Sequence, residues 1–98
     1  MPMETTVRDD PEAGRYEIVD GDRLLGVAAY ERRGETLVFT HTEVDPDAGR
    51  PGLGSTLVRG ALDDVRGRGG TVVALCPFVR GWIERHPEYG DLVSEPDR

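Results

Sequence analysis

The stretch GRPGLGSTLVRGALDDVRGRGGTVVAL, residues 49–75, joins a glycine-rich loop, a helical pattern and an apolar strand. The glycines of RGRGG after the helical pattern are typical of a helix C-terminus. The β-branched and small residues 71–75 predict a buried strand. A strand followed by a helix and a second strand implies a right-handed crossover and parallel pairing. The predicted helix covers residues 55–66, and its apolar face consists of Leu57, Val58, Ala61, Leu62 and Val65.

Strand patterns precede this unit. RYEIVD (residues 15–20) and RLLGVAAYERR (23–33) flank the turn dipeptide Gly21-Asp22, which is a hairpin signature. GETLVFTHTEVDP (34–46) predicts a third antiparallel strand, and residues 78–85 a second helix. We therefore expect an α/β (α+β) fold, with a mixed, mostly antiparallel sheet and two helices.

The 98 residues predict a single domain. The expected organisation is a disordered N-terminal arm over residues 1–14, a folded domain over 15–93 and a polar tail over 94–98. A net charge of −7 argues against nucleic acid as a partner. One cysteine, no signal peptide and no apolar run of about 20 residues predict a cytoplasmic protein with no membrane partner.

The glycine-rich loop is placed where it can bind an anion. A strand leads into it and a helix follows, so first-turn N–H groups and the helix dipole both favour negative charge. Gly52 and Gly54 allow close approach of a ligand, and the Ser55 hydroxyl adds a donor. No lysine follows the glycines and no Rossmann unit opens here, so ATP and NAD are not expected. The alternative is that the glycines only form a turn.

Cys76 follows the strand of residues 71–75 and precedes Pro77, a residue type preferred at the first position of a helix. A cysteine at a helix N-terminus lies at the positive end of the dipole, which favours the reactive thiolate. The alternative is a buried cysteine that packs as a small apolar side chain.

His41 and Glu43 are a candidate proton-transfer pair. Strict alternation places both on one strand face with Leu37 and Phe39. The alternative is a structural histidine with a solvated neighbour. His86, at the end of the second helix, is interpreted as structural, and the scattered Cys and His residues predict no metal site.

The order of these elements resembles the GNAT superfamily of acetyl-CoA-dependent N-acetyltransferases. HTEVDP, GLGSTLV, ALDDVR and CPFVRGWIERHPEY look like its minimal single-domain branch, and the resemblance covers residues 15–93. It implies that acetyl-CoA lies in a cleft where the third and fourth predicted strands splay apart. The cofactor-binding residues that it implies are Glu43 and Val44 for the pantetheine arm, Arg50, Gly52, Leu53, Gly54 and Ser55 for the pyrophosphate, and Pro77 and Phe78 beside them.

For catalysis the resemblance implies Cys76, with His41 nearby on the neighbouring strand. We expect His41 to act as general base, with Glu43 orienting it or relaying the proton through water. Transfer to an amine then proceeds either through an acetyl thioester on Cys76 or by direct attack, with Tyr89 protonating the CoA thiolate. The expected partners are a CoA thioester and a small-molecule or protein amine, with the chain a monomer or weak dimer.

The glycine loop departs from the superfamily pattern. Gly49 stands where an Arg or Gln is expected, Arg50 comes one place late, and Pro51 has no N–H to donate. Two other functions remain open: a catalytically weak CoA-binding sensor or interaction module, and a thiol enzyme that acts through Cys76 and His41 without CoA.

Overall fold

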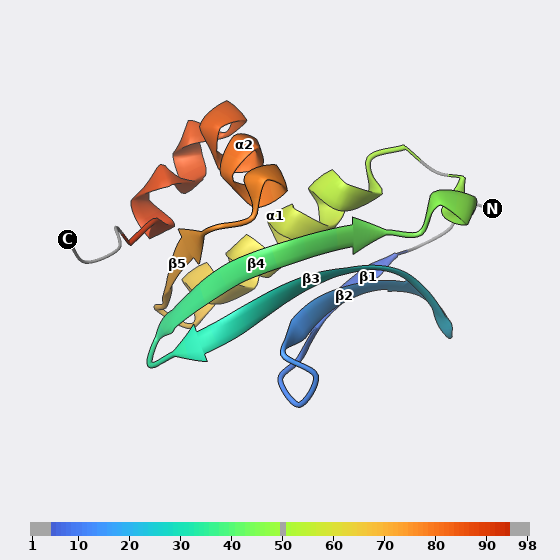
Figure 1. Cartoon of the computed structure of the whole chain (residues 1–98), viewed down its shortest axis with the longest axis horizontal. Coiled ribbons are helices and arrows are strands. Elements are labelled where there is room, and N and C mark those ends of the chain that lie inside the picture. Colours follow the sequence, from blue (N-terminus) through green and yellow to red (C-terminus); the bar gives the residue numbers. More distant parts are fainter. Residues whose placement is uncertain (1–4, 50, 95–98) are drawn as a thin grey trace.

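A single five-stranded sheet forms the body of the molecule (Figure 1), as seen in a computed structural model that describes residues 5–49 and 51–94. The strands lie side by side in chain order, with β1 to β4 antiparallel and β5 parallel to β4. The pairing of β2, β3 and β4 and the crossover to β5 follow the sequence-based prediction, so the expected mixed, mostly antiparallel fold is confirmed. The strands are β1 Thr6–Asp10, β2 Arg15–Asp20, β3 Arg23–Arg33, β4 Thr36–Val44 and β5 Thr71–Ala74.

Strand β1 corrects the prediction of a disordered arm over residues 1–14. It pairs with β2 from Thr6 opposite Val19 to Asp10 opposite Arg15. The charged and polar side chains of this segment hid the pairing, because an edge strand with one exposed face needs few apolar residues. Residues 1–4 and 95–98 lie outside the described part of the chain, as does most of the predicted polar tail.

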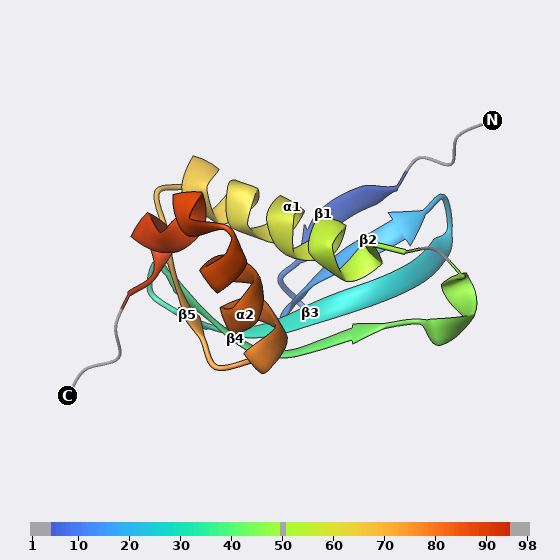
Figure 2. The ribbon, with the colours of Figure 1, turned by 90° about the horizontal axis from the view of Figure 1, so that it is seen from above.

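Two α-helices cover one face of the sheet and leave the other face open (Figure 2). α1 spans Leu53–Gly67 and α2 spans Pro77–Arg85. α1 begins two residues earlier than predicted, because Gly52 adopts a positive φ of 79° and turns the chain into the helix. The predicted apolar face is confirmed. The buried residues of α1 are Leu53, Leu57, Val58, Ala61, Leu62 and Val65.

Two 3-10 helices complete the described chain, η1 Pro46–Ala48 before α1 and η2 Pro87–Leu92 after α2. The chain then returns to β5, where Val93 forms a parallel bridge with Val72. None of the helices formed by residues 5–49 and 51–94 is long and apolar enough to cross a membrane.

Candidate active site

A β-bulge in β4 decides which of its side chains face the helices. Tyr30 of β3 lies opposite Phe39, but the preceding Ala29 lies opposite His41, so Thr40 is an extra residue in the ladder. One extra residue shifts the alternation of side chains by one position. Odd-numbered side chains of β4 therefore face the helices before the bulge, and even-numbered side chains face them after it.

The bulge separates the two predicted catalytic groups. Phe39 is buried in the core under the helices, and after the bulge Thr42 and Val44 continue on its face. His41 and Glu43 then lie on the open face, with side chains 61% and 74% exposed. The prediction that His41 and Glu43 share a face with Phe39 is therefore wrong.

A cleft of about 580 Å³ lies on the helix side, where β4, α1 and α2 meet. Beyond Phe39, which pairs with Ala74, β4 runs on without β5 beside it, because β5 ends at Ala74 and the chain continues into α2. The two strands are paired along the whole of β5, so the gap beside β4 comes from the shortness of β5. The cleft is lined by Thr42 and Val44 of β4, by Gly52, Leu53, Gly54 and Ser55 at the start of α1, and by Phe78, Trp82, Arg85 and His86 of α2 and its end.

The first turn of α1 presents free backbone donors to this cleft. Its N-cap, Gly52, makes no side-chain capping bond, and the first intrahelical bond is donated by the Thr56 N–H to the Gly52 carbonyl oxygen. The N–H groups of Leu53, Gly54 and Ser55 are therefore without helical partners. This arrangement fits a phosphate group, which helix N-termini bind through such donors.

The absence of a side chain at Gly54 allows the close approach of Phe78. A Cβ added at Gly54 would lie 2.7 Å from Cζ of the Phe78 ring, which is a clash. Phe78 is 41% exposed and forms one wall of the cleft. Pro77, in contrast, begins α2 without lining the cleft, and Arg50 lies outside the described residues.

Ser55 is tied to α2 by a hydrogen bond that the sequence did not reveal. Its Oγ accepts the Trp82 Nε1–H at 2.8 Å. The Trp82 ring in turn stacks on His86, with ring centroids 3.9 Å apart. Phe78, Trp82, Arg85 and His86 are spaced by four, three and one residues, so the helical period of α2 was the signal that places them in one cleft.

Cys76 is the N-cap of α2, as predicted, but its side chain is 4% exposed. Its Sγ is 3.3 Å from Oγ1 of Thr42, in a hydrogen bond across the gap at the end of β5. The thiol is therefore bonded to Thr42, which lines the cleft, but does not line the cleft itself. Because His41 points to the other face of β4, the two are not brought together as a thiol–imidazole pair.

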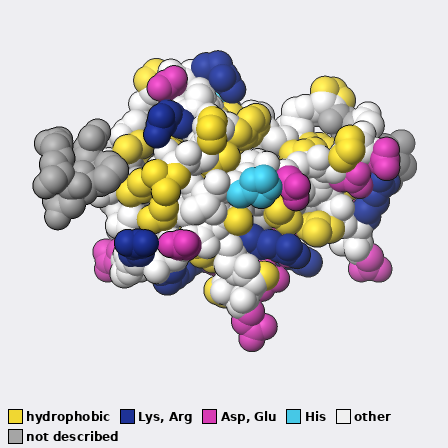
Figure 3. Space-filling model, in the orientation of Figure 1, with side chains coloured by type: hydrophobic (Ala, Val, Ile, Leu, Met, Phe, Trp, Pro, Cys, Tyr) yellow, Lys and Arg dark blue, Asp and Glu magenta, His cyan; other side chains and the backbone are white. Residues whose placement is uncertain are grey.

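On the open face, Nε2 of His41 lies 3.6 Å from Oε2 of Glu43. Figure 3 views this face, on which a histidine side chain lies beside an acidic one among apolar groups. The pair is thus solvent-accessible and separated from the cleft by one strand.

Tyr89 does not line the cleft. Its hydroxyl donates a hydrogen bond to Oδ1 of Asp63 on α1 at 2.8 Å, and its ring packs edge-on against Trp82. The hydrogen bond to Asp63, with burial, raises the pKa of Tyr89. The raised pKa makes Tyr89 a weaker acid. Its ring packs on Trp82 without lining the cleft, away from the position expected of a proton donor.

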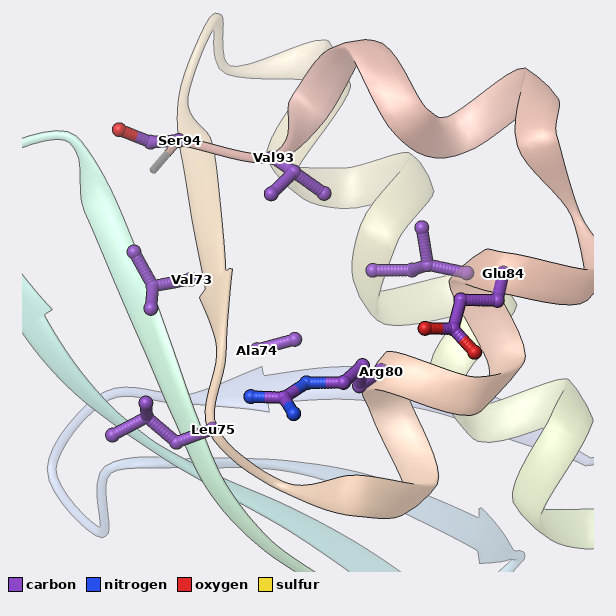
Figure 4. A pocket seen from close by; sticks show the side chains of 8 residues that line it. Val73, Ala74, Leu75, Arg80, Glu84, Val93 and Ser94 are labelled. Atoms are coloured by element: carbon purple, nitrogen blue, oxygen red, sulfur yellow. The ribbon is translucent and has the colours of Figure 1, made fainter. Parts of the chain in front are cut away.

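A second groove, of about 300 Å³, lies on the other side of α2, along the outer edge of β5 (Figure 4). Arg80 and Glu84 point into it from α2, and Leu75 and Val93 form apolar walls. α2 thus divides two grooves, each containing one of its arginines. Within residues 5–49 and 51–94, no group of three or more His, Cys, Asp or Glu side chains is arranged to hold a metal ion.

Comparison with known proteins finds the same fold. The sequence model of the family described as GCN5-related N-acetyl-transferase matches residues 15–92. The solution structure of a GCN5-like protein from Staphylococcus aureus has a TM-score of 0.68 and 19% identity, covering 95% of this chain and 91% of that one. No match was found among curated proteins.

Two larger solved enzymes contain a similar fold as part of their length. The ribosomal-protein-S18-alanine N-acetyltransferase of Escherichia coli has a TM-score of 0.60 and 18% identity, over 74% of this chain and 50% of that one. The N-acetylglutamate synthase of Neisseria gonorrhoeae, solved with coenzyme A and N-acetyl-glutamate, has a TM-score of 0.57 and 20% identity, over 84% of this chain and 22% of that one.

Proposed function

Because the chain belongs to the GCN5-related N-acetyltransferase family, we propose that it takes acetyl-CoA into the cleft between β4, α1 and α2 and transfers the acetyl group to an amine. Members of this family are acyltransferases that use acetyl-CoA as the acetyl donor. What we propose is where the donor binds in this chain and how the amine reaches it.

One observation carries the proposal: a single cleft combines an uncapped helix N-terminus with an unpaired strand edge. The first-turn amides of α1 suit the pyrophosphate, and their positive end of the helix dipole adds to the attraction. The edge of β4 beyond Phe39 suits an extended amide-containing arm, which pairs with a strand edge as another strand does.

The direction of the backbone groups on β4 refines which residues hold that arm. The Asp45 N–H donates to the Leu25 carbonyl oxygen on β3. Backbone groups alternate between the two edges of a strand, so those of Thr42 and Val44 point to the free edge and those of Glu43 point to β3. Val44 and Thr42 are therefore better candidates than Glu43 for pairing with the pantetheine arm.

We infer direct transfer, with the amine approaching from the open face of the sheet and reaching the acetyl group through the gap beyond Phe39, where β4 has no strand beside it. Attack on the acetyl carbon forms the new C–N bond, breaks the C–S bond and releases a proton from the amine. His41 is on that face, and Glu43 is placed to stabilise the imidazolium that results from taking the proton. The departing CoA thiolate then takes a proton from solvent.

The Cys76 thioester route is the alternative for the same reaction. Its thiol is near the cleft through Thr42, but it is buried, and His41 lies on the other face of β4 and is not paired with it as a base. The two routes predict different masses when no amine is present: an acetyl adduct on Cys76 in the thioester route, and unmodified protein in direct transfer.

Intact-mass measurement with acetyl-CoA and a panel of amines tests the proposal. The expected result is an acetylated amine and free CoA, with Cys76→Ala retaining most of the turnover. A lasting adduct on Cys76 together with loss of turnover in that variant would establish the thioester route instead. CoA binding without acetylation of any amine would identify a sensor, and alkylation of Cys76 without CoA binding would favour a thiol enzyme.

A further inference from the structure

The α2 wall of the cleft contains a positive charge, the Arg85 guanidinium, across from the glycine loop. Arg85 and His86 both line the cleft, opposite Gly52 and Gly54 at the start of α1. The chain as a whole has a net charge of −7, so a guanidinium in this cleft is a local departure from its acidic surface. An anion that enters the cleft is therefore contacted from two sides.

Arg85 has no acidic partner among the described residues. Most of the other described arginines are paired: Arg8 and Arg15 with Glu17, Arg23 with Asp45, Arg33 with Glu31, Arg66 with Asp91, and Arg68 with Asp9 and Asp64. In a protein with an excess of carboxylates, an arginine that lines a cavity and pairs with none is available to an anionic ligand.

The end of α2 is held in place by contacts that leave Arg85 and His86 facing the cleft. His86 Nδ1 lies 2.8 Å from the Trp82 carbonyl oxygen, which can only accept, so Nδ1 carries the proton. Ser55 fixes Trp82 from the α1 side. Arg85 lies back along its own helix, since a Cβ added at Gly81 would be 3.4 Å from its Nη1.

The glycine loop has few backbone donors for a phosphate group, which leaves room for contacts from the opposite wall of the cleft. Pro51 has no N–H, and Gly52 turns the chain with a positive φ before the first helical amide. The loop therefore supplies fewer backbone donors than its length allows. A guanidinium on the opposite wall replaces a donor and adds a full charge, which shortens and strengthens hydrogen bonds to phosphate.

We propose that Arg85, at the end of α2 and seated beside the Trp82–His86 stack, binds a phosphate group of CoA from the wall opposite the glycine loop. This rests on the proposed function, because it concerns the ligand of the same cleft. The CoA molecule has a pyrophosphate and a 3′-phosphate, and the chemistry of Arg85 suits either.

Isothermal titration calorimetry with CoA and 3′-dephospho-CoA tests this assignment in wild type, Arg85→Gln and Arg80→Gln. Arg80 is the matched control, because it is also unpaired among the described residues but lines the groove on the other side of α2. Loss of a charged hydrogen bond is expected to weaken CoA binding to Arg85→Gln by about tenfold or more. Arg80→Gln, with the same change in net charge, is expected to stay within twofold of wild type.

The second ligand identifies the phosphate. Weakened binding of CoA alone assigns Arg85 to the 3′-phosphate, and weakened binding of both ligands assigns it to the pyrophosphate. Arg85→Gln is also expected to show a smaller loss of affinity between low and high salt, which a purely structural arginine would not produce.

Two results would overturn the inference while leaving the proposed function intact: wild-type affinity for both ligands in Arg85→Gln, or an equal loss in Arg80→Gln. Failure of folded wild-type protein to bind CoA would overturn both. Circular dichroism of each variant establishes that the chain is folded before binding is compared.

Discussion

At the scale of single residues, Glu17 is the one charged residue that is buried among those the structure describes, with 3% of its surface exposed. Burial alone would raise the pKa of its carboxyl. The hydrogen bonds from Arg15 Nε at 2.8 Å and Arg8 Nε at 2.9 Å more than offset this, so the pKa of Glu17 is lowered from about 4.5. The carboxylate thus joins β1 to β2 as an ion.

This shift predicts an acid-sensitive contribution to stability. Since the folded-state pKa is below the unfolded one, the contribution is complete above about pH 4.5 and is lost as the pH falls through the folded-state pKa. Glu17→Gln is expected to lower the free energy of unfolding at pH 7 by about 1 to 3 kcal/mol, and to lose less stability than wild type on acidification. Urea unfolding at pH 7 and below pH 4 measures both. The exposed Glu31→Gln is the control, and an equal effect there would contradict the prediction.

His41 and Tyr89 give opposite predictions for transfer. His41→Ala is expected to slow turnover by about 10² to 10⁴, the range for a positioned base, with CoA affinity unchanged. Tyr89→Phe is expected to keep near-wild-type turnover and to lose about 1 kcal/mol of stability, because its hydroxyl is bonded to Asp63. Steady-state kinetics and thermal unfolding check both. A loss below tenfold in His41→Ala would reduce His41 to a surface residue.

The sequence identified His41 and Glu43 as neighbours but placed them on the wrong face. The extra residue Thr40 reverses the alternation, and a bulge of this kind has no residue-type signature in the strand. Cys76 as the cap of α2 was predicted correctly, because a strand end followed by proline is a local signal. Its distance from His41 depended on the bulge and was not predictable.

At the scale of elements, β1 depends on a glycine in α1. A Cβ added at Gly60 would lie 2.7 Å from Cβ of Val7, so the strand and the helix pack more closely here than any larger residue allows. The amphipathic pattern of α1 was readable from sequence, whereas this contact joins segments more than fifty residues apart and was not.

Gly60→Ala tests this contact against helix propensity. Propensity alone would stabilise α1 by about 1 kcal/mol, but the clash with Val7 is expected to reverse the sign and destabilise the protein. Gly67→Ala, at the end of the same helix with nothing within 4 Å of the added Cβ, is the matched control and is expected to be neutral or stabilising. Chemical unfolding measures both. Stabilisation by Gly60→Ala would show that β1 does not pack on α1.

At the scale of the whole molecule, the fold from β2 onward was predictable because its elements follow one another in chain order. Strand order β1 to β5 equals sequence order, so the hairpins and one crossover determine the sheet. The cleft was predictable in outline from the glycine loop. Its α2 wall was not, because it depends on how α2 lies against α1 through Trp82 and Ser55.

A ligand that joins β4, α1 and α2 should stabilise the entire chain. CoA at 100 times its dissociation constant is expected to raise the free energy of unfolding by about 2.7 kcal/mol, because only the folded cleft binds it. Gly54→Asp is expected to abolish this shift by displacing Phe78 and repelling phosphate. Thermal unfolding with and without CoA checks this, and an equal shift in Gly54→Asp would place the ligand elsewhere.

The central claim is that acetyl-CoA lies in the cleft between β4, α1 and α2. Titration of the ¹⁵N-labelled protein with acetyl-CoA, followed amide by amide in NMR spectra, tests it most directly. We predict the largest shifts at Gly52 to Ser55, at Thr42 and Val44, and at Phe78 to His86, with β1 and β2 unchanged. Saturable shifts centred instead on the β5 groove around Leu75 and Arg80, or no shifts at all, would contradict the account.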